Sequence, residues 1–404
     1  MNTYDVIVVG AGASGIISAI TIKKSDKIKV LLIDQDSKIA RKVSTAGNGR
    51  CNLFNINKYK YFGDTDFVND VLGDNCSGFV SDLLKNIGIN SVIDNSGRAY
   101  PSTYQAETVV DALKLALSRA NVDFHLNEAL LDISTATNGF LVLTSKNKYF
   151  CKKLILSMGS NAGVKASTNV LEICDSLNLK NIKFEPALCS VECYDTDIIN
   201  LSGLRVKASI SLDFQHKTDG EILFTDYGIS GIATMQLSRF IKNDSVLHID
   251  FRESFGFENL DEDDIFDILE NRLNSYPNDN AENLLVGLCN RKIARVLLKR
   301  ANIYIKDTSF KLIKKDDIIK LVKLICDFDV KVKRSRGLQY AQVAKGGVDT
   351  SQINPKTMES SIEGLYLTGE ELNVDGDTGG YNLMFAFKSG YNAGSDILKK
   401  FTRR

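Results

Sequence analysis

The sequence predicts an α/β protein in which a parallel-sheet domain, built from both ends of the chain, is interrupted by a β-rich insert and a helical segment. Near the N-terminus, the apolar run of residues 6–9 leads into the turn GAGASG and a helix with regularly spaced isoleucines. From about residue 187 short alternating strands replace this pattern, and residues 258–326 are predicted to be nearly all helical. The chain ends with an apolar run, a glycine-rich loop and a helix, which we expect to complete the first domain.

The first 34 residues have the pattern of a unit that binds a dinucleotide. A second apolar run, residues 28–33, ends at Asp34, at the spacing from the turn at which an acid accepts hydrogen bonds from a ribose 2′-OH. The pyrophosphate is expected at the helix N-terminus, where free N–H groups and the helix dipole favour an anion. The acid disfavours NADP here and leaves NAD and FAD open. The predicted turn residues of this Rossmann-like domain are Gly10, Ala11, Gly12, Ala13, Ser14 and Gly15.

Composition and charge restrict the function classes. The 404 residues suffice for two or three domains, and Lys+Arg and Asp+Glu both total 50, so no net field attracts nucleic acid or an anionic membrane. No apolar run is long enough to span a membrane, and the first strand begins almost at once, so we expect a soluble, cytoplasmic protein. Eight cysteines without a CxxC pair and three scattered histidines predict neither a metal site nor disulfide-reductase chemistry.

A glycine-rich, partly cationic loop, residues 37–52, follows the first acid. Backbone N–H groups freed by its glycines suit a pyrophosphate or the polar edge of a flavin, with a solvated turn as the alternative. Cys51 has no partner cysteine nearby, which favours packing over a redox role. The cofactor-binding residues predicted in this loop are Lys42, Thr45, Gly47, Asn48, Gly49, Arg50 and Cys51.

The middle of the first domain is predicted from periodicity. Helices are expected at about 66–88 and 105–120, followed by short strands. His125 lies in one of them and is interpreted as a satisfied core or edge histidine. A further apolar strand near 153–160 ends in small residues, which predicts that Gly159 lies close to the cofactor. The expected domain boundaries are 1–186 and 346–404 for the dinucleotide domain, 187–257 and 329–345 for the β-rich insert, and 258–328 for the helical subdomain.

Four stretches carry a resemblance to a known family. They are KVSTAGNGRCN from Lys42, Phe224–Gly231, a GGV segment followed by NPKTMES, and Gly369–Leu383. They resemble the bacterial FAD-binding flavoproteins described as aminoacetone oxidase-like or bile-acid Δ4,6-reductase-like, within the two-dinucleotide-binding-domain flavoproteins. The resemblance implies a discontinuous, Rossmann-like FAD-binding domain with an inserted β-barrel-like domain and a helical subdomain. Asp226 stands where the family usually has histidine, and Ile232 where it has proline, so any role of that histidine is in doubt here.

The resemblance also implies further cofactor contacts. Glu370 would approach the flavin ribitol, the loop 376–383 would direct N–H groups at the pyrimidine carbonyl, and residues 128–130 would lie against the adenine. The residues implied in this way are Ala129, Gly369, Glu370, Asp377, Gly379, Gly380, Tyr381, Asn382 and Leu383.

The expected function is that of an FAD-dependent oxidoreductase. NAD(P)H would reduce the flavin, which would reduce an activated C=C of a small organic substrate. The sequence has no second GxGxxG unit, so the nicotinamide is expected to bind transiently. The alternatives are a flavin oxidase of an amine-type substrate using O2 and a non-enzymatic, flavin-bearing partner-binding protein. RNA modification is disfavoured by the neutral charge. Candidate catalytic residues, each with ordinary packing as the alternative, are Arg50, Asn52, Arg98, Tyr227 and Tyr381.

Overall fold

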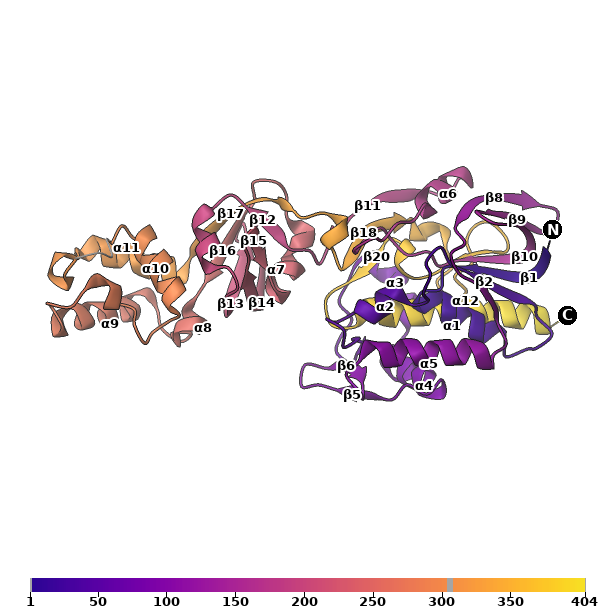
Figure 1. Ribbon diagram of the computed structural model, residues 1–404, viewed down its shortest axis with the longest axis horizontal. Coiled ribbons are helices and arrows are strands. Elements are labelled where there is room, and N and C mark those ends of the chain that lie inside the picture. The colour runs from indigo at the N-terminus through magenta and orange to yellow at the C-terminus, as the bar shows by residue number, and fades with distance from the viewer. Residues whose placement is uncertain (1, 304–307, 404) are drawn as a thin grey trace. The chain divides into compact units, whose positions relative to one another are not determined.

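The computed structural model describes residues 2–303 and 308–403, which form two compact units (Figure 1). Unit 1 comprises Met1–Glu185 and Val343–Arg404, and unit 2 is the continuous segment Pro186–Gln342. Unit 1 is therefore made from both ends of the chain.

The core of unit 1 is a parallel sheet. Strand β1 (Asn2–Val9) pairs in parallel with β2 (Val30–Ile33) on one side and with β10 (Lys148–Leu156) on the other. Strand β2 then pairs in parallel with β7 (Asp123–His125), and β10 with β19 (Leu365–Leu367). All four residues of β2 are buried, as expected for a strand covered on both faces. Because the strands are parallel, Gly10, Asp34, Ser157 and Thr368 follow them at one edge of the sheet. Ligands bind at this carboxyl edge in open α/β sheets.

An antiparallel hairpin extends the sheet. Strands β8 (Leu130–Ala136) and β9 (Gly139–Thr144) pair with each other, and β9 pairs with the first half of β10. The remaining strands form small separate sheets. They are β3 (Phe54–Asn55), β5 (Ser91–Ile93) and β6 (Arg98–Pro101) in one, β4 (Tyr61–Gly63) with β20 (Val374–Gly376), and β11 (Asn181–Ala187) with β18 (Val343–Val348).

Helix α1 (Ala13–Ile22) packs along the last helix of the chain, α12 (Tyr381–Thr402) (Figure 1). The two backbones approach closely because α12 carries glycine at the contact: a Cβ on Gly390 would lie 2.2 Å from the Ser14 carbonyl oxygen. The Ser18 hydroxyl donates to the Gly390 carbonyl at 2.9 Å. The other helices of unit 1 are α2 (Arg41–Thr45), α3 (Thr65–Leu72), α4 (Cys76–Asn86), α5 (Ala106–Arg119) and α6 (Val170–Ser176).

The single helix predicted at about 66–88 is wrong, because two helices occupy this stretch. Helix α3 ends at Gly73, which has φ +68°, and Asn75 caps α4 by accepting from the Gly78 N–H at 3.3 Å. A left-handed glycine followed by a capping asparagine ends one helix and starts the next.

Unit 2 contains a closed six-stranded barrel. Its strands are β12 (Val191–Cys193), β15 (Gly228–Ser230), β14 (His216–Phe224), β13 (Arg205–Leu212), β16 (Val246–Asp250) and β17 (Phe328–Ser335). Short helices α7 (Ile232–Leu237) and α8 (Arg252–Phe255) adjoin it, and large side chains such as Phe224, Phe251 and Phe328 are fully buried. The barrel and the helical segment share one apolar core.

The helical segment of unit 2 contains α9 (Glu262–Ser275), α10 (Arg291–Arg300) and α11 (Lys315–Cys326). The prediction of nearly continuous helix over 258–326 was too broad, because residues 276–290 hold only a short 3-10 turn. Pro277 and Gly287, which has φ +84°, lie in this stretch, and both residue types disfavour a continuous helix. The Arg300 guanidinium joins the helices to the barrel: it pairs with Asp197 at 2.6 Å and lies 3.9 Å from the Phe328 ring centroid.

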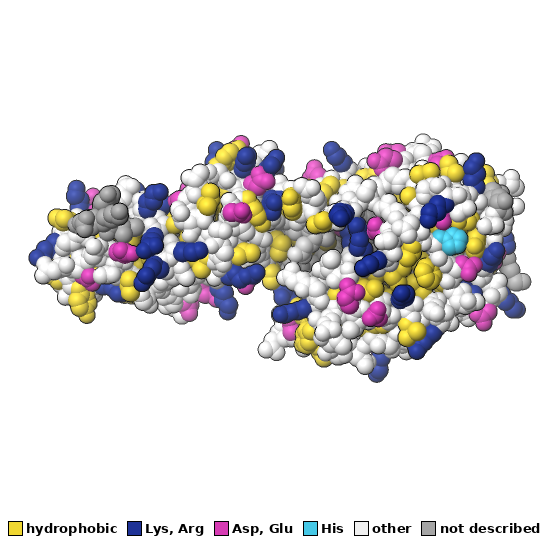
Figure 2. Space-filling model, in the orientation of Figure 1, with side chains coloured by type: hydrophobic (Ala, Val, Ile, Leu, Met, Phe, Trp, Pro, Cys, Tyr) yellow, Lys and Arg dark blue, Asp and Glu magenta, His cyan; other side chains and the backbone are white. Residues whose placement is uncertain are grey.

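Among the described residues, no helix is long and apolar enough to cross a membrane. The described residues also contain no group of three or more His, Cys, Asp or Glu side chains that could hold a metal ion. On the face drawn in Figure 2, Lys and Arg side chains lie among Asp, Glu and apolar ones on both units.

Candidate cofactor site at the carboxyl edge of the sheet

The glycines of the turn between β1 and α1 have two different roles. A Cβ on Gly10 would lie 2.2 Å from the Ser157 carbonyl oxygen, and one on Gly15 would lie 1.9 Å from that of Gly10, so both are needed for packing. Gly12 differs, because a Cβ there would meet no protein atom within 4 Å. Gly12 is the N-cap residue of α1, and it has no side chain to accept a hydrogen bond from the first N–H groups of the helix. The backbone is therefore bare where the helix dipole favours an anion.

Asp34 closes the other side of this turn. Its Oδ2 accepts from the Ala11 N–H at 2.6 Å and its Oδ1 from the Asp36 N–H at 2.7 Å. Burial raises the pKa of the Asp34 carboxyl, and these two backbone N–H groups act against that rise. The Glu128 N–H donates to the Asp34 main-chain carbonyl at 2.8 Å, so the backbone just before Ala129 pairs with the backbone of the acid. The acid is thus held in place before any ribose is bound.

Lys42 and Glu370 form the charged centre of the edge. Residues Arg41–Thr45 of the predicted loop form helix α2, and from it the Lys42 Nζ donates to Glu370 Oε2 at 2.6 Å. Glu370 Oε1 accepts from the Ser160 hydroxyl at 2.9 Å and from the Ala344 N–H at 3.2 Å. Gly159 adjoins this group, since its Cβ would lie 4.0 Å from Glu370. The chain segments after β2, β10 and β19 therefore meet here with the start of β18.

The rest of the loop after α2 is mostly exposed. Gly47, Asn48, Gly49 and Arg50 are exposed, and a Cβ on Gly49 would meet nothing within 4 Å. Thr45 is also exposed, and its hydroxyl donates to the Lys42 carbonyl at 3.2 Å.

Cys51 is fully buried, and burial raises the pKa of its thiol to about 12. A thiol of this kind is protonated at neutral pH and unreactive, because the thiolate is the nucleophile. Its surroundings therefore agree with packing and not with a redox role.

The loop between β20 and α12 is fixed by its own side chains. Asn382 accepts from the Gly376 N–H and donates to the Gly376 carbonyl, both at 2.8 Å. Gly380 has φ +98°, and its Cβ would lie 2.6 Å from both the Asn52 side chain and the Phe54 carbonyl. The Thr378 hydroxyl is buried and has no hydrogen-bond partner among the described residues. A rigid loop with an unsatisfied hydroxyl is suited to bind a polar group of a ligand.

The neighbours of this loop include three predicted residues. Arg98 lies beside Gly379, where a Cβ would be 3.4 Å from its Nε. Tyr381 begins α12, and its hydroxyl donates to the Lys58 carbonyl at 3.2 Å. Asp377 and Leu383 flank these positions in the loop and in the first turn of α12, respectively.

Unit 1 therefore holds every predicted cofactor residue, together with Arg50, Asn52, Arg98 and Tyr381. Tyr227 lies in unit 2, in the turn between β14 and β15.

Three polar residues that build this edge were missed by sequence reasoning. Ser160 contacts Glu370 and follows the predicted Gly159 directly, so the small polar residue after a strand-end glycine was an available signal. The Asn55 amide donates to the Gly379 carbonyl at 2.9 Å, and no local pattern indicates it. Glu371 is fully buried and accepts from the Met158 N–H at 2.7 Å. Burial raises the pKa of Glu371 to about 8.

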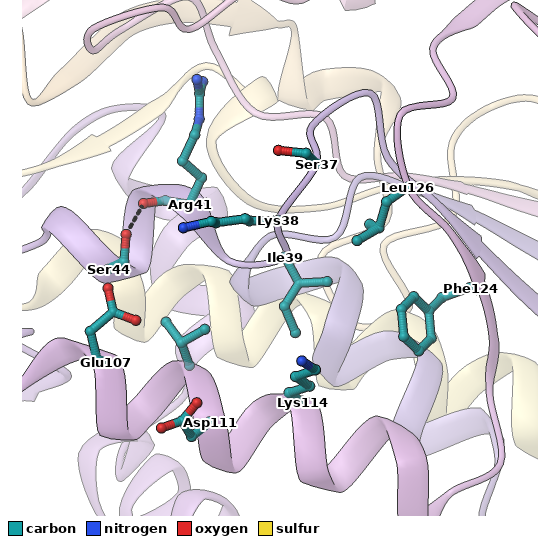
Figure 3. A pocket seen from close by; sticks show the side chains of 11 residues that line it. Ser37, Lys38, Ile39, Arg41, Ser44, Glu107, Asp111, Lys114, Phe124 and Leu126 are labelled. Atoms are coloured by element: carbon teal, nitrogen blue, oxygen red, sulfur yellow. Dashed lines mark hydrogen bonds between the residues drawn. The ribbon is translucent and has the colours of Figure 1, made fainter.

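A pocket of about 270 Å³ lies beside the edge (Figure 3). The segment after Asp34 forms one wall of the pocket, and helix α5 forms another. Two of the lining residues contact each other, because the Ser44 hydroxyl donates to the Arg41 carbonyl at 2.8 Å. None of the predicted cofactor residues lines it. The lining residues are Ser37, Lys38, Ile39, Arg41, Ser44, Glu107, Val110, Asp111, Lys114, Phe124 and Leu126.

Several known proteins are similar to this chain over nearly all of its length. A 3-dehydro-bile acid delta(4,6)-reductase of Clostridium scindens is 28% identical over 96% of this chain and 97% of that protein. A ribosomal RNA dihydrouridine synthase of Escherichia coli is 26% identical over 98% of this chain and 99% of that protein. A 3-ketosteroid-delta4-(5alpha)-dehydrogenase structure from Rhodococcus jostii has a TM-score of 0.52 at 13% identity, covering 98% of this chain and 97% of that one, which shows a shared fold.

The family model described as the HI0933-like protein Rossmann domain matches residues 4–396, almost the whole chain. The chain therefore belongs to the HI0933-like family, which confirms both the predicted flavoprotein family and the predicted fold class.

Proposed function

We propose that the chain is an FAD-dependent oxidoreductase that reduces a C=C bond conjugated to a carbonyl group. The observation that carries the proposal is the carboxyl edge of unit 1, along which lie the fixed Asp34 after β2, the open Gly12 after β1, and Glu370 after β19 with its partner Lys42. This order suits a ligand in which a pyrophosphate joins an adenosine ribose to a second polar half.

The residues present fit FAD. Residues 10–15 would hold the pyrophosphate at the N-terminus of α1, and Asp34 would accept from the adenosine ribose. Glu370, with Lys42 and Ser160, would bind the ribitol hydroxyl groups, and the rigid loop 376–380 would meet the pyrimidine edge with N–H groups and Thr378. When bound, FAD supplies two-electron hydride transfer, while the protein orients the substrate and excludes water.

The names of the relatives point to one kind of bond. One relative is named as a reductase of a 3-dehydro-bile acid, and two as dihydrouridine synthases of ribosomal RNA. A 3-oxo-4-ene and the C5=C6 bond of uracil are both alkenes conjugated to a carbonyl. Such a bond accepts a hydride at the carbon remote from the carbonyl and a proton at the adjacent carbon. We infer this bond type from the chemistry that the two names share.

The proposed hydride source is NADH or NADPH. The test is anaerobic stopped-flow mixing of the FAD-loaded protein with each nicotinamide, followed by 3-oxochol-4-enoate with mass-spectrometric detection of the product. The expected results are bleaching of the flavin and a product heavier by two hydrogen atoms. Absence of flavin reduction by both nicotinamides would overturn the reductase proposal. Peroxide formation during turnover of an amine would favour an oxidase. Stable FAD binding without turnover of any substrate would favour a non-enzymatic flavoprotein.

A second candidate substrate is a uridine of ribosomal RNA. It is favoured by the two dihydrouridine synthases, which are 26% and 27% identical over 98% of this chain. The formal net charge of zero argues against it, because RNA binding relies on basic surfaces. Incubating the same FAD-loaded protein and NADPH with unmodified ribosomal RNA, then digesting the RNA to nucleosides, tests it. Formation of dihydrouridine without reduction of the free enone would make RNA the substrate.

A further inference from the structure

Arg98 lies beside the loop that is proposed to meet the pyrimidine edge of the flavin. It is the first residue of β6, which pairs with β3 so that Arg98 lies opposite Asn55. The Asn55 amide donates to the Gly379 carbonyl at 2.9 Å, and a Cβ on Gly379 would lie 3.4 Å from the Arg98 Nε. The side chain of Arg98 therefore packs directly on the backbone of this loop, and all three residues belong to unit 1.

The turn that carries Arg98 is fixed by an acid whose carboxylate binds the backbone. Asp94 Oδ1 accepts from the Arg98 N–H at 2.9 Å, from the Ser96 N–H at 2.9 Å and from the Ser96 hydroxyl at 2.7 Å. The backbone at Arg98 is thus held in place before a ligand binds. This preorganisation lowers the entropy cost of placing its side chain against a ligand.

The guanidinium of Arg98 carries a charge that no acid neutralises at close range. Arg41, another arginine of unit 1, pairs with Asp36 at 3.0 Å. Within the described part of the chain, by contrast, Arg98 has no carboxylate within ion-pair distance. Arg98 is half-buried, so a ligand can reach it, while its charge is screened less than that of a fully exposed arginine.

The start of α12 adds positive potential at the same loop. Helix α12 begins at Tyr381, directly after the loop, with no acid in its first turn and no side-chain cap from Gly380. Burial and the charge of Asp377 raise the pKa of the Tyr381 hydroxyl, and the charge of Arg98 acts against this rise. The Asp377 Oδ1 itself accepts from the Thr378 N–H at 2.6 Å. The charge of Arg98 is therefore felt where the helix dipole is positive.

We propose that Arg98 raises the reduction potential of the bound flavin by stabilising the negative charge of its reduced form. Transfer of a hydride to flavin N5 adds two electrons and one proton, so the reduced ring carries one negative charge. This charge is spread over N1 and the C2 carbonyl oxygen unless a second proton binds at N1. A guanidinium at this edge stabilises the charge as it develops and disfavours protonation of N1, which makes the flavin easier to reduce by a nicotinamide. The inference rests on the proposed FAD site and adds the residue that tunes its redox chemistry.

A potentiometric titration of the full, FAD-loaded chain tests this role, with dithionite as the reductant and redox dyes as the reference. Arg98→Gln is expected to lower the ratio of the affinities for reduced and oxidised FAD ~10-fold, which corresponds to a potential lower by ~30 mV for two electrons. Arg98→Lys keeps the charge and is expected to lie nearer to the wild type than to Arg98→Gln. The absorbance of the reduced flavin, followed against pH, should show that N1 loses its proton about one pH unit higher in Arg98→Gln.

Arg119→Gln is the matched control, because Arg119 is an exposed arginine in the last turn of α5. It is expected to change neither the potential nor the pH at which N1 loses its proton, and thermal unfolding checks that each variant is folded. An unchanged potential in Arg98→Gln, or an equal shift in Arg119→Gln, would overturn the inference. Loss of oxidised FAD from Arg98→Gln would also overturn it, because Arg98 would then hold the cofactor in both redox states.

Reduction by dithionite needs neither a nicotinamide nor an alkene, so the outcome does not depend on the proposed reductase function. A lowered potential in Arg98→Gln, without turnover of any conjugated alkene by the wild type, would retain the role of Arg98 and remove the reductase function. Reduction of the alkene by a flavin whose potential does not depend on Arg98 would retain the reductase function and remove the role of Arg98.

Discussion

Glu371 makes the stability of unit 1 depend on pH. Its side chain is fully buried beneath the carboxyl edge and accepts from the Met158 N–H at 2.7 Å and the Thr368 N–H at 3.4 Å. Burial raises its pKa from 4.5 to about 8, against these hydrogen bonds. Between these two values the folded protein binds more protons than the unfolded chain, so stability falls as the pH rises. At ~1.4 kcal/mol for each pH unit, the loss above pH 8 reaches at most ~5 kcal/mol.

Glu371→Gln tests this directly. The amide mimics the neutral carboxyl and keeps an acceptor for the Met158 N–H, so the free energy of unfolding is expected to change little between pH 5 and 8. The variant should match the wild type within ~1 kcal/mol at pH 5 and exceed it by several kcal/mol at pH 8. Urea unfolding of the FAD-free protein at several pH values measures both.

Glu371→Ala is the control. It leaves a cavity and unpaired N–H groups, so it should be destabilised at every pH. Parallel curves for the wild type and Glu371→Gln, or a less stable Glu371→Gln at pH 8, would refute the reasoning.

Three other predictions concern the glycine turn, the charged pair and the barrel. Gly12→Ala should lower FAD affinity at least ~10-fold without changing the melting temperature of the FAD-free protein. Gly15→Ala should instead cost more than ~3 kcal/mol of stability, because its Cβ would lie 1.9 Å from the Gly10 carbonyl oxygen. An unchanged FAD affinity of Gly12→Ala in a fluorescence titration would contradict the pyrophosphate assignment. Lys42→Met should slow flavin reduction ~10-fold in stopped flow. It should alter the free energy of unfolding by less than ~1 kcal/mol, because the Lys42–Glu370 pair is partly exposed. An unchanged reduction rate would show that Lys42 has no role in this step. Arg300→Met should destabilise unit 2 by ~3 kcal/mol in thermal unfolding, because Asp197 loses its ion-pair partner. It should leave FAD affinity unchanged. A loss of stability below ~1 kcal/mol would contradict this prediction.

The sequence predicts this fold well where the signal is local. The apolar runs of β1 and β2, the turn between them and the alternating strands of the barrel are each specified within a few residues, and the structure has them. The break between α3 and α4 was missed because Gly73 and Asn75 lie within otherwise helical periodicity. Local patterns are least informative at element boundaries.

The site was predictable as separate segments and not as an arrangement. Lys42 and Glu370 were both identified, but 328 residues separate them, and nothing in either segment indicates their contact. Such contacts follow from tertiary packing, which periodicity does not encode.

The packing of α12 on α1 has a consequence for biosynthesis. The N-terminal end of α1, where the proposed pyrophosphate site lies, packs against Gly390, which is synthesised after the whole of unit 2. Unit 2 is one uninterrupted stretch and can fold while the C-terminal segment is still being made. A nascent chain that stops before α12 lacks the helix against which α1 packs. The dinucleotide site is therefore expected to mature after unit 2, although its motif is synthesised before unit 2.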